Sequence, residues 1–341
     1  MQMQELHLRH FFSIFATCGG GMEVKMKKTF MGIDLGGTKI NIAWAFENGD
    51  IFYREKLYVK DLNVTVNEQI IILVENCIKH SINNSYSLKR FGLGIPGVYT
   101  KDGRIALNTN LKGLDIPYIK KSIYEKFSIE MKVMNDVRCA ALGEKWKGVA
   151  KGCNDFIYIN IGTGISAGIV SGGRIISGHD NAAGEIAYFI TEEDIQTTSS
   201  GIWQFDPDKA PFERKVSGRG ISELLKEKVE KDIYKIEGYK KEELSAKNIF
   251  KLAHDGEPAC IEALNNFIKH LSVGIANLCI ALNPEMVVFG GGLSNDYDIF
   301  AGKIDFFLKA LTPYPPKIAR AGLGYEAGLY GALYLAIKEI D

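Results

Sequence analysis

The sequence has no excess of charge of either sign. Its 341 residues carry 41 Lys and Arg against 41 Asp and Glu, so the formal net charge is zero. Proteins that bind nucleic acid or an anionic membrane surface usually concentrate positive charge. We therefore expect neither a nucleic-acid partner nor a membrane partner.

Cysteine is scarce and scattered along the chain. The six cysteines are Cys18, Cys77, Cys139, Cys153, Cys260 and Cys279. Their spacing is that of neither a metal site nor a disulfide framework. Such usage is typical of a reducing compartment, which favours a cytoplasmic protein.

The apolar stretch near the start, FFSIFA, is too short to span a bilayer. It also makes a poor signal peptide, because no small-x-small cleavage site follows it. We expect residues 1–28 to be a disordered leader or the product of a mis-assigned start. Met22 or Met26 would then begin the chain, since the first strand begins near Thr29.

The length exceeds one typical core and predicts two domains. Two stretches more than 120 residues apart share one pattern: an apolar strand, a polar residue at its end, a turn of Gly and Thr, and a second apolar strand. The first has Asp34 before Gly36-Gly37-Thr38, and the second has Asn160 before Gly162-Thr163-Gly164. The repetition predicts an internal duplication and, with strands alternating with helices, an α/β fold of two lobes.

Local patterns predict several further elements. Apolar residues at helical spacing predict helices over 220–236 and over 246–284, the second ending at Asn283-Pro284. Residues 191–215 have no clear period and are typical of a long loop. Asn48-Gly49-Asp50 predicts the turn of a hairpin.

The sequence contains no P-loop pattern, G-x-x-x-x-G-K-[ST]. Residues 92–97 and 162–167 match G-x-G-x-x-G/A, but neither match opens a helix, as a dinucleotide fingerprint must. Both observations argue against the commonest nucleotide-binding folds.

The glycine turns suit phosphate better, because successive backbone amides in a turn bind anions. An isolated Gly36-Gly37 would be an ordinary hairpin, but the turn recurs at 162–164 and a third glycine cluster follows at 290–292. Two such turns, one from each lobe, would hold a triphosphate. Asp34 would bind Mg²⁺ directly or through water, and Lys39 would lie near the phosphates.

Asn135-Asp136 stands where a strand ends and a helix begins. The simplest role of Asp136 is to cap that helix. A carboxylate near a helix N-terminus is also held ionised, and it can accept the proton of an attacking hydroxyl. Asp136 is thus a candidate general base for phosphoryl transfer.

Taken together, these residues resemble the ROK family (repressor, open reading frame, kinase), and the resemblance covers residues 29–341. The matching motifs are DLGGTK at 34–39, GIPG at 94–97, the Asn110 region, ND at 135–136, IGTGISAGIV at 161–170, AAGEIAYF at 182–189, FERKVSG at 212–218 and NPEMVVFGGGLS at 283–294. The resemblance implies a two-lobed actin/hexokinase-like ATPase fold with duplicated ribonuclease H-like domains. Residues 29–136 with about 325–341 would form the small lobe, and 137–324 the large one.

The same resemblance implies roles for individual residues. Asp136 would be the general base for a sugar hydroxyl. The hexose would lie against Gly97, Asn110, Asn135, Glu185 and Glu213. The ATP site would comprise Asp34, Gly36, Gly37, Thr38, Lys39, Gly162, Thr163, Gly164, Gly291 and Gly292, with Mg²⁺ at Asp34.

The sequence departs from the family pattern in three places. The usual G-E-I-G-H reads GEIAY, so Tyr188 replaces a His that would bind zinc and sugar. The loop before Glu213 has no cysteine, and we expect no structural zinc. That loop would be fixed by Trp203, Phe205 and Phe212, or else be mobile. Ser166 stands where a glycine is usual.

The resemblance implies an ATP-dependent hexose kinase acting on the C6 hydroxyl. Alternatives are a non-catalytic sugar-binding regulator and an inactive kinase homologue. A repressor would need an N-terminal DNA-binding domain of about 70 residues, which the 28 residues before the first strand do not supply. Glucose is the default sugar; fructose, mannose, allose and N-acetylated hexosamines stay open. Related kinases are often dimers, so we expect a homodimer.

Overall fold

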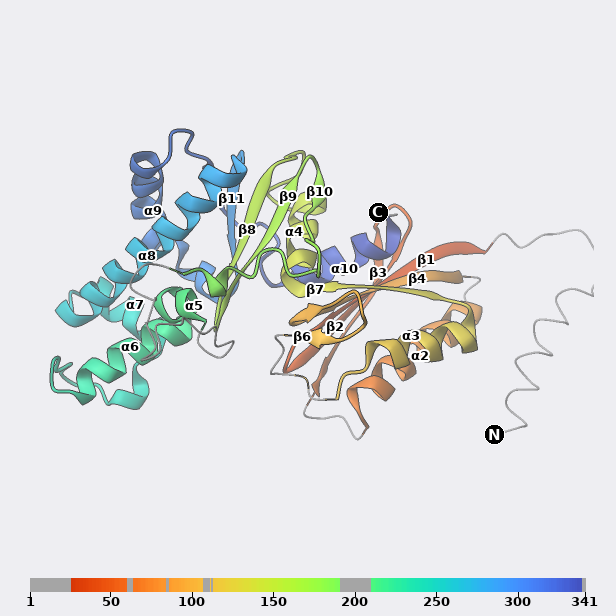
Figure 1. The fold of residues 1–341 in the computed structure, drawn as a ribbon. Coiled ribbons are helices and arrows are strands. Elements are labelled where there is room, and N and C mark those ends of the chain that lie inside the picture. Colours follow the sequence, from red (N-terminus) through yellow and green to blue (C-terminus); the bar gives the residue numbers. More distant parts are fainter. Residues whose placement is uncertain are drawn as a thin grey trace, which may run out of the picture.

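The computed structural model describes residues 26–59, 64–83, 86–106, 111, 113–190 and 210–338. The expectations for the leader up to residue 25 and for Asn110, Trp203 and Phe205 lie outside these residues. Two lobes, each built around one sheet, lie side by side with helices between them (Figure 1).

The N-terminal lobe is built on a sheet of order β3-β2-β1-β4-β7. Its strands are β1 (Lys27–Leu35), β2 (Lys39–Phe46), β3 (Ile51–Tyr58), β4 (Tyr86–Ile95) and β7 (Glu130–Asn135). The first three are antiparallel neighbours, whereas β4 and β7 run parallel to β1. The predicted turn at Asn48-Gly49-Asp50 joins β2 to β3.

Helices α2 (Val66–Asn83) and α3 (Ile116–Phe127) lie together below this sheet in Figure 1. Their apolar sides join the core of the lobe, which includes Met31, Ile70 and Ile119. A small hairpin of β5 (Val98–Tyr99) and β6 (Ile105–Ala106) follows β4.

The C-terminal lobe repeats the plan with a sheet of order β10-β9-β8-β11-β12. Its strands are β8 (Phe156–Ile161), β9 (Ile165–Ser171), β10 (Arg174–Ile175), β11 (Met286–Gly290) and β12 (Lys317–Arg320). Again three antiparallel strands precede two parallel ones. The same order in both lobes confirms the duplication predicted from the two strand–turn–strand stretches.

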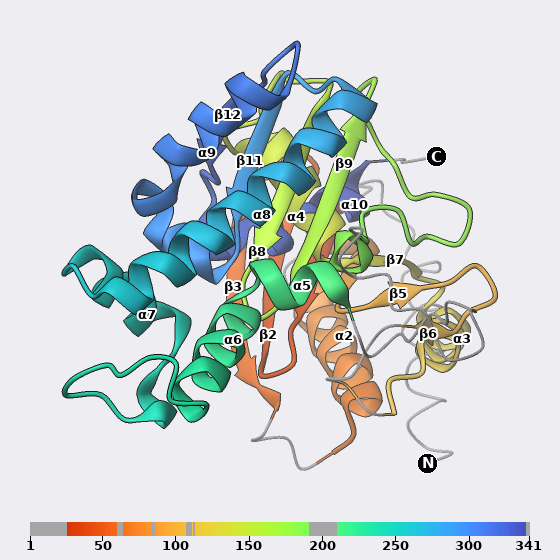
Figure 2. The same ribbon diagram turned by 60° about the vertical axis from the view of Figure 1, so that its left-hand side comes forward.

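Helices cover the outer side of this second sheet (Figure 2). They are α5 (Pro211–Val216), α6 (Gly218–Glu230), α7 (Ala246–His254), α8 (Pro258–Leu282) and α9 (Tyr297–Leu311). Their apolar sides and the sheet form one core, in which Phe267, Phe289 and Phe300 are fully buried. Each lobe therefore has a core of its own.

Two helices cross between the sheets: α4 (Asp136–Lys147) and α10 (Ala327–Ile337). Helix α10 packs on β1 and β4 of the first sheet, and α4 packs on β8 and β9 of the second. The two helices also make extensive contact with each other. Because α4 begins where β7 ends, its first residues lie at the junction of the lobes.

Three boundaries differ from those that the sequence patterns predict. The helix expected over 246–284 is two helices, because Gly256 takes a left-handed φ of 96° between α7 and α8. Helix α6 ends at Glu230 rather than 236. The loop expected over 191–215 ends early, since α5 begins at Pro211. Periodicity continued through the first two of these breaks because the flanking apolar residues face the same core.

Candidate active site

A pocket of about 260 Å³ lies at the junction of the lobes. Asp34 and Gly36 reach it from the β1–β2 side, Asp136 from the start of α4, and Asn160 and Gly291 from the ends of β8 and β11. In each copy of the duplicated unit, a polar residue ends the central strand. These two residues, Asp34 and Asn160, line the same pocket.

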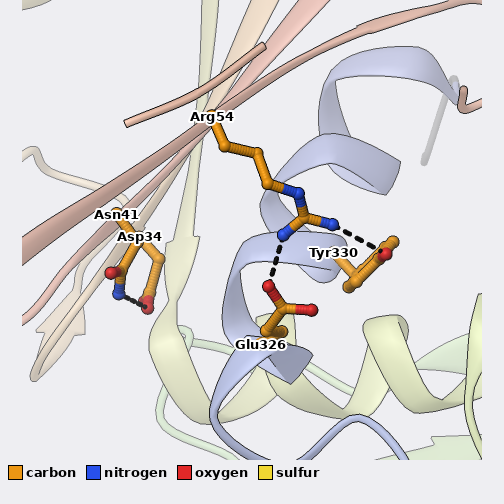
Figure 3. Close-up of polar contacts among 5 residues, drawn as sticks. All are labelled: Asp34, Asn41, Arg54, Glu326 and Tyr330. Atoms are coloured by element: carbon orange, nitrogen blue, oxygen red, sulfur yellow. Dashed lines mark hydrogen bonds and ion pairs between the residues drawn. The ribbon is translucent and has the colours of Figure 1, made fainter. Parts of the chain in front are cut away.

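Asp34 is the last residue but one of β1 and lies half-buried in this pocket. Asn41, opposite it on β2, donates a hydrogen bond from Nδ2 to Asp34 Oδ2 at 3.2 Å (Figure 3). Burial raises the pKa of the Asp34 carboxyl, and the bond from Asn41 opposes that rise. Asn41 therefore orients the carboxylate and partly offsets its desolvation.

At the start of α4, the residue that caps the helix is Asn135 and not Asp136. Asn135 Oδ1 accepts from the backbone N–H groups of Val137 at 3.0 Å and Arg138 at 3.1 Å, and its Nδ2 donates to the Gly97 carbonyl at 3.0 Å. The N-cap is therefore Asn135, and Asp136 is the first residue of the helix rather than its cap. Asp136 Oδ1 also accepts from Val137 N–H at 2.9 Å, and the Asp136 carboxylate lines the pocket.

The electrostatic environment of Asp136 is unusual for a carboxyl group. Burial raises its pKa to about 7, and the negative charge of Asp34 contributes to the rise. A group with this pKa exchanges its proton readily near neutral pH, as a general base must. The geometry thus joins a proton acceptor to a second carboxylate in one pocket.

Burial raises the pKa of both carboxyl groups, and the charge of Asp34 adds to the rise at Asp136, so a cation in this pocket would stabilise their ionised forms. Their oxygen donors are those that Mg²⁺ prefers, and Asp34 is already fixed by Asn41. In the described part of the chain no three His, Cys, Asp or Glu side chains gather as a metal cluster. The two aspartates therefore suit an ion whose remaining ligands are water or phosphate.

The glycine turns lie close to this pocket. The turn after β1 is closed by a hydrogen bond from Gly36 N–H to the Lys39 carbonyl at 2.8 Å, and Gly37 and Thr38 at its tip are exposed. Lys39 is also exposed, and its ammonium lies over the ring of Tyr58, 5.8 Å from the centroid. Gly37 and Thr38 are thus exposed at the tip of the turn, while the Lys39 side chain lies beside it over Tyr58.

The equivalent turn of the C-terminal lobe is closed by Gly162 N–H bonding to the Gly164 carbonyl at 2.9 Å. It faces the loop after β11, because a Cβ on Gly162 would lie 3.7 Å from the Gly292 nitrogen. Gly291 has a left-handed φ of 81°, and a Cβ there would meet the Ile161 carbonyl at 2.5 Å. Only glycine allows β11 to pass this close to the end of β8.

Glu185 and Glu213, two of the residues expected to bind a sugar, interact electrostatically with each other. Burial raises the pKa of Glu185, the positive charge of Arg138 lowers it, and the negative charge of Glu213 raises it again. Glu213 accepts a hydrogen bond from Ile165 N–H at 3.1 Å and pairs with Arg219 at 2.6 Å. The charge of Glu185 raises the pKa of Asp136, and the charge of Glu213 raises the pKa of Glu185, so the three carboxylates influence one another's ionisation in series.

Arg138, whose charge acts on Glu185, is a residue that the sequence patterns did not single out. Its side chain is 3% exposed, Nη2 donates to the Asn181 carbonyl, and Nε has no hydrogen-bond partner. Asn181 in turn donates to the Tyr99 carbonyl at 2.9 Å, which links the two lobes. The available signal was an arginine within the first turn of an otherwise apolar helix, VRCAAL.

The residues replaced around the expected zinc loop have other surroundings. Tyr188 ends a short 3₁₀ turn (Ile186–Tyr188) that packs against the core of the C-terminal lobe. Phe212 is buried, and its ring packs at a tilt against that of Phe189 at a centroid distance of 5.6 Å. Residues 191–209 lie outside the described residues, so the absence of zinc stays a prediction.

The junction carries a further polar contact on its outer side. Arg54 of β3 forms an ion pair with Glu326, just before α10, and donates to the Tyr330 hydroxyl at 3.0 Å (Figure 3). These bonds tie an edge strand of the first sheet to the start of the crossing helix. In the part of the chain that the structure describes, no helix combines the length and apolarity needed to cross a lipid bilayer.

Comparison with curated proteins finds sugar kinases and regulators. The glucokinase of Halalkalibacterium halodurans is 30% identical over 323 residues, 91% of this chain and 95% of that protein. The N-acetyl-D-glucosamine kinase of Haemophilus influenzae is 27% identical, over 91% of this chain and 100% of that protein. A putative xylose repressor of Caldicellulosiruptor is 29% identical, over 79% and 67% respectively.

Among solved structures, the ROK hexokinase from Thermus thermophilus matches with a TM-score of 0.71 and 23% identity, over 90% of this chain and 97% of that one. At this identity the match establishes the fold, a two-lobed α/β architecture of the actin/hexokinase-like type. The sequence pattern of the ROK family matches residues 30–339. With that match spanning nearly all of the chain, the protein belongs to the ROK family.

Proposed function

We propose that the protein is an ATP-dependent sugar kinase that phosphorylates a hexose at its C6 hydroxyl. The observation that carries the proposal is the pocket in which Asp136 meets Asp34, Gly36 of the turn after β1, and Asn160 and Gly291 of the C-terminal lobe. Kinases of glucose and of N-acetyl-D-glucosamine among the relatives support the same reaction class. Glucose is the first candidate substrate.

In the proposed reaction the sugar lies against Gly97, Asn135, Glu185 and Glu213, with its C6 hydroxyl at Asp136. The hydroxyl oxygen forms a bond to the γ-phosphorus while the bond to the bridging oxygen of ADP breaks. The hydroxyl proton passes to Asp136, whose pKa of about 7 suits that transfer. ADP leaves with the electrons of the broken bond.

The polyphosphate would lie between the two glycine turns, with its adenosine near Gly291 and Gly292. Backbone amides of the turns would bind its oxygens, and Asp34 would hold Mg²⁺. When bound, this ion neutralises phosphate charge. Closure of the lobes over the sugar would exclude water from the transferred group.

A non-catalytic sugar-binding regulator is the second candidate, since a putative xylose repressor is among the relatives. A sensor needs the sugar-binding residues but no proton acceptor for phosphoryl transfer. The Asp34–Asp136 pair favours the kinase, because burying two mutually repelling carboxylates is costly without chemistry to perform.

The test is a coupled-enzyme measurement of ADP release with glucose, mannose, fructose, allose and N-acetyl-D-glucosamine. We expect turnover with at least one sugar, and Asp136→Asn to lower kcat about 10²- to 10⁴-fold while sugar affinity changes little. Asp305→Asn, whose carboxylate pairs with Lys309 on α9, is the matched control. No turnover with any sugar, or near-normal kcat in Asp136→Asn, would contradict the proposal.

A further inference from the structure

In this structure the carboxylate of Glu213 is already occupied on both oxygens. Oε2 accepts from Ile165 N–H at 3.1 Å, and Oε1 pairs with Arg219 Nη2 at 2.6 Å. The Glu213 side chain is 16% exposed and that of Arg219 58% exposed, so the guanidinium is the accessible partner. A sugar hydroxyl that donates to Glu213 Oε1 at the position where the guanidinium lies must displace Arg219.

Arg219 also lies directly against the glycine turn of the C-terminal lobe. It is the second residue of α6, and its N–H donates to the Thr163 carbonyl at 3.4 Å. The preceding Gly218 donates to the Gly162 carbonyl at 2.8 Å. The start of α6 is thus fixed on the turn, and the guanidinium is tethered within one side chain's length of it.

A guanidinium beside a turn of backbone amides is a strong phosphate ligand, because it adds charge and a fork of donors. Here that cation is paired with a carboxylate expected to bind sugar. Building on the proposed function, we propose that Arg219 is a phosphate-binding residue that Glu213 holds back until a sugar arrives. Sugar hydroxyls that take over Glu213 release the guanidinium to the polyphosphate at residues 162–164.

The arrangement makes the two substrates assist each other. Without sugar, the phosphate site lacks its arginine and ATP binds more weakly. Weaker binding limits hydrolysis of ATP when no sugar is present. With sugar, the freed arginine binds phosphate, and by linkage ATP must strengthen sugar binding by the same factor. This mutual dependence is what the experiment measures.

The first arm compares Arg219→Ala with the wild type by isothermal titration, using D-glucose, N-acetyl-D-glucosamine and a non-hydrolysable ATP analogue as probes. Removing a half-exposed ion pair should tighten sugar binding in the absence of nucleotide by about threefold. In the presence of sugar, removing the phosphate contact should raise the Kd of the ATP analogue about tenfold or more. The mutual strengthening of the two ligands should disappear.

The second arm uses Glu213→Gln, which removes the charge that retains the guanidinium. We expect the ATP analogue to bind this variant without sugar as tightly as it binds the wild type with sugar. Sugar affinity should fall, because a carboxylate acceptor is lost. The two variants thus move nucleotide affinity in opposite directions, which a merely damaged fold would not do.

Arg214→Ala is the matched control, since Arg214 is also 58% exposed and pairs with Glu227 at 3.9 Å on the neighbouring helix. It should leave both affinities and kcat unchanged. Parallel loss of sugar and nucleotide affinity in Arg219→Ala, or unchanged nucleotide affinity in both variants, would overturn the role of Arg219. A wild type that binds both ligands without turnover would refute the proposed reaction while leaving the coupling measurable.

Discussion

Asp136 lies where its own negative charge is costly. Burial and the charge of Asp34 raise its pKa to about 7, against about 3.8 for an unperturbed carboxyl. Its backbone position is fixed by the cap that Asn135 provides, so the side chain cannot withdraw without disrupting α4. The residue that the sequence singled out for chemistry is thus held in the structure at a cost to stability.

This cost predicts a pH-dependent stability difference. Because the folded state holds the Asp136 proton up to about pH 7 and the unfolded state loses it near pH 4, stability falls as pH rises between these values. Asp136→Asn removes the penalty and should stabilise the metal-free protein at pH 8 by roughly 2–4 kcal/mol. Thermal unfolding in EDTA at pH 4 and pH 8 measures it; equal shifts at both values would contradict the assignment.

At the scale of elements, the position of α10 depends on a buried carboxylate in α4. Glu144 is fully buried, and it accepts from the N–H groups of Val149 at 2.8 Å, Gly322 at 3.0 Å and Leu323 at 2.8 Å. These bonds hold the segment that leads into α10 and so toward Gly328, which packs against Asp34. Sequence spacing alone could not predict this contact, because its partners lie 178 and 179 residues away.

Glu144→Gln should therefore destabilise the protein by about 3 kcal/mol. A glutamine side chain has only one carbonyl oxygen, and its NH₂ group would face at least one of the three backbone N–H donors. The urea midpoint of unfolding measures the effect. Glu125→Gln, an exposed glutamate of α3 paired with Lys121, is the control and should change the midpoint little. A shift no larger than the control's would show that the three amides find other acceptors.

At the scale of the whole molecule, the two lobes meet through small residues of α4 and α10. A Cβ on Gly331 would lie 1.7 Å from the Cys139 carbonyl oxygen, so the helices cross with their backbones nearly in contact. This close crossing brings the ends of β1 and β8 to one pocket. The crossing of the helices therefore sets how close Asp34 and Asn160 lie in that pocket.

Gly331→Ala should destabilise the protein by about 3 kcal/mol and lower any kinase activity, because the crossing helices must separate. Gly302→Ala on α9 is the matched control, since nothing lies within 4 Å of its Cβ position. There alanine should be neutral or stabilising by up to about 1 kcal/mol, as an improved helix former. Urea unfolding distinguishes the two; equal midpoints would refute the tight crossing.

Local sequence patterns were enough to predict the two-lobed α/β fold, the duplication, and the residues of the strand ends and turns, because alternating apolar strands and glycine turns are local features. They were not enough for the cap of α4, the break at Gly256 or the start of α5, because a single side chain or φ angle determines each of these. The pocket shared by Asp34 and Asp136, the burial of Arg138 with its charge acting on Glu185, and the pairing of Arg219 with Glu213 depend on how the elements pack. Such contacts join residues from different elements, and packing between those elements sets their distances.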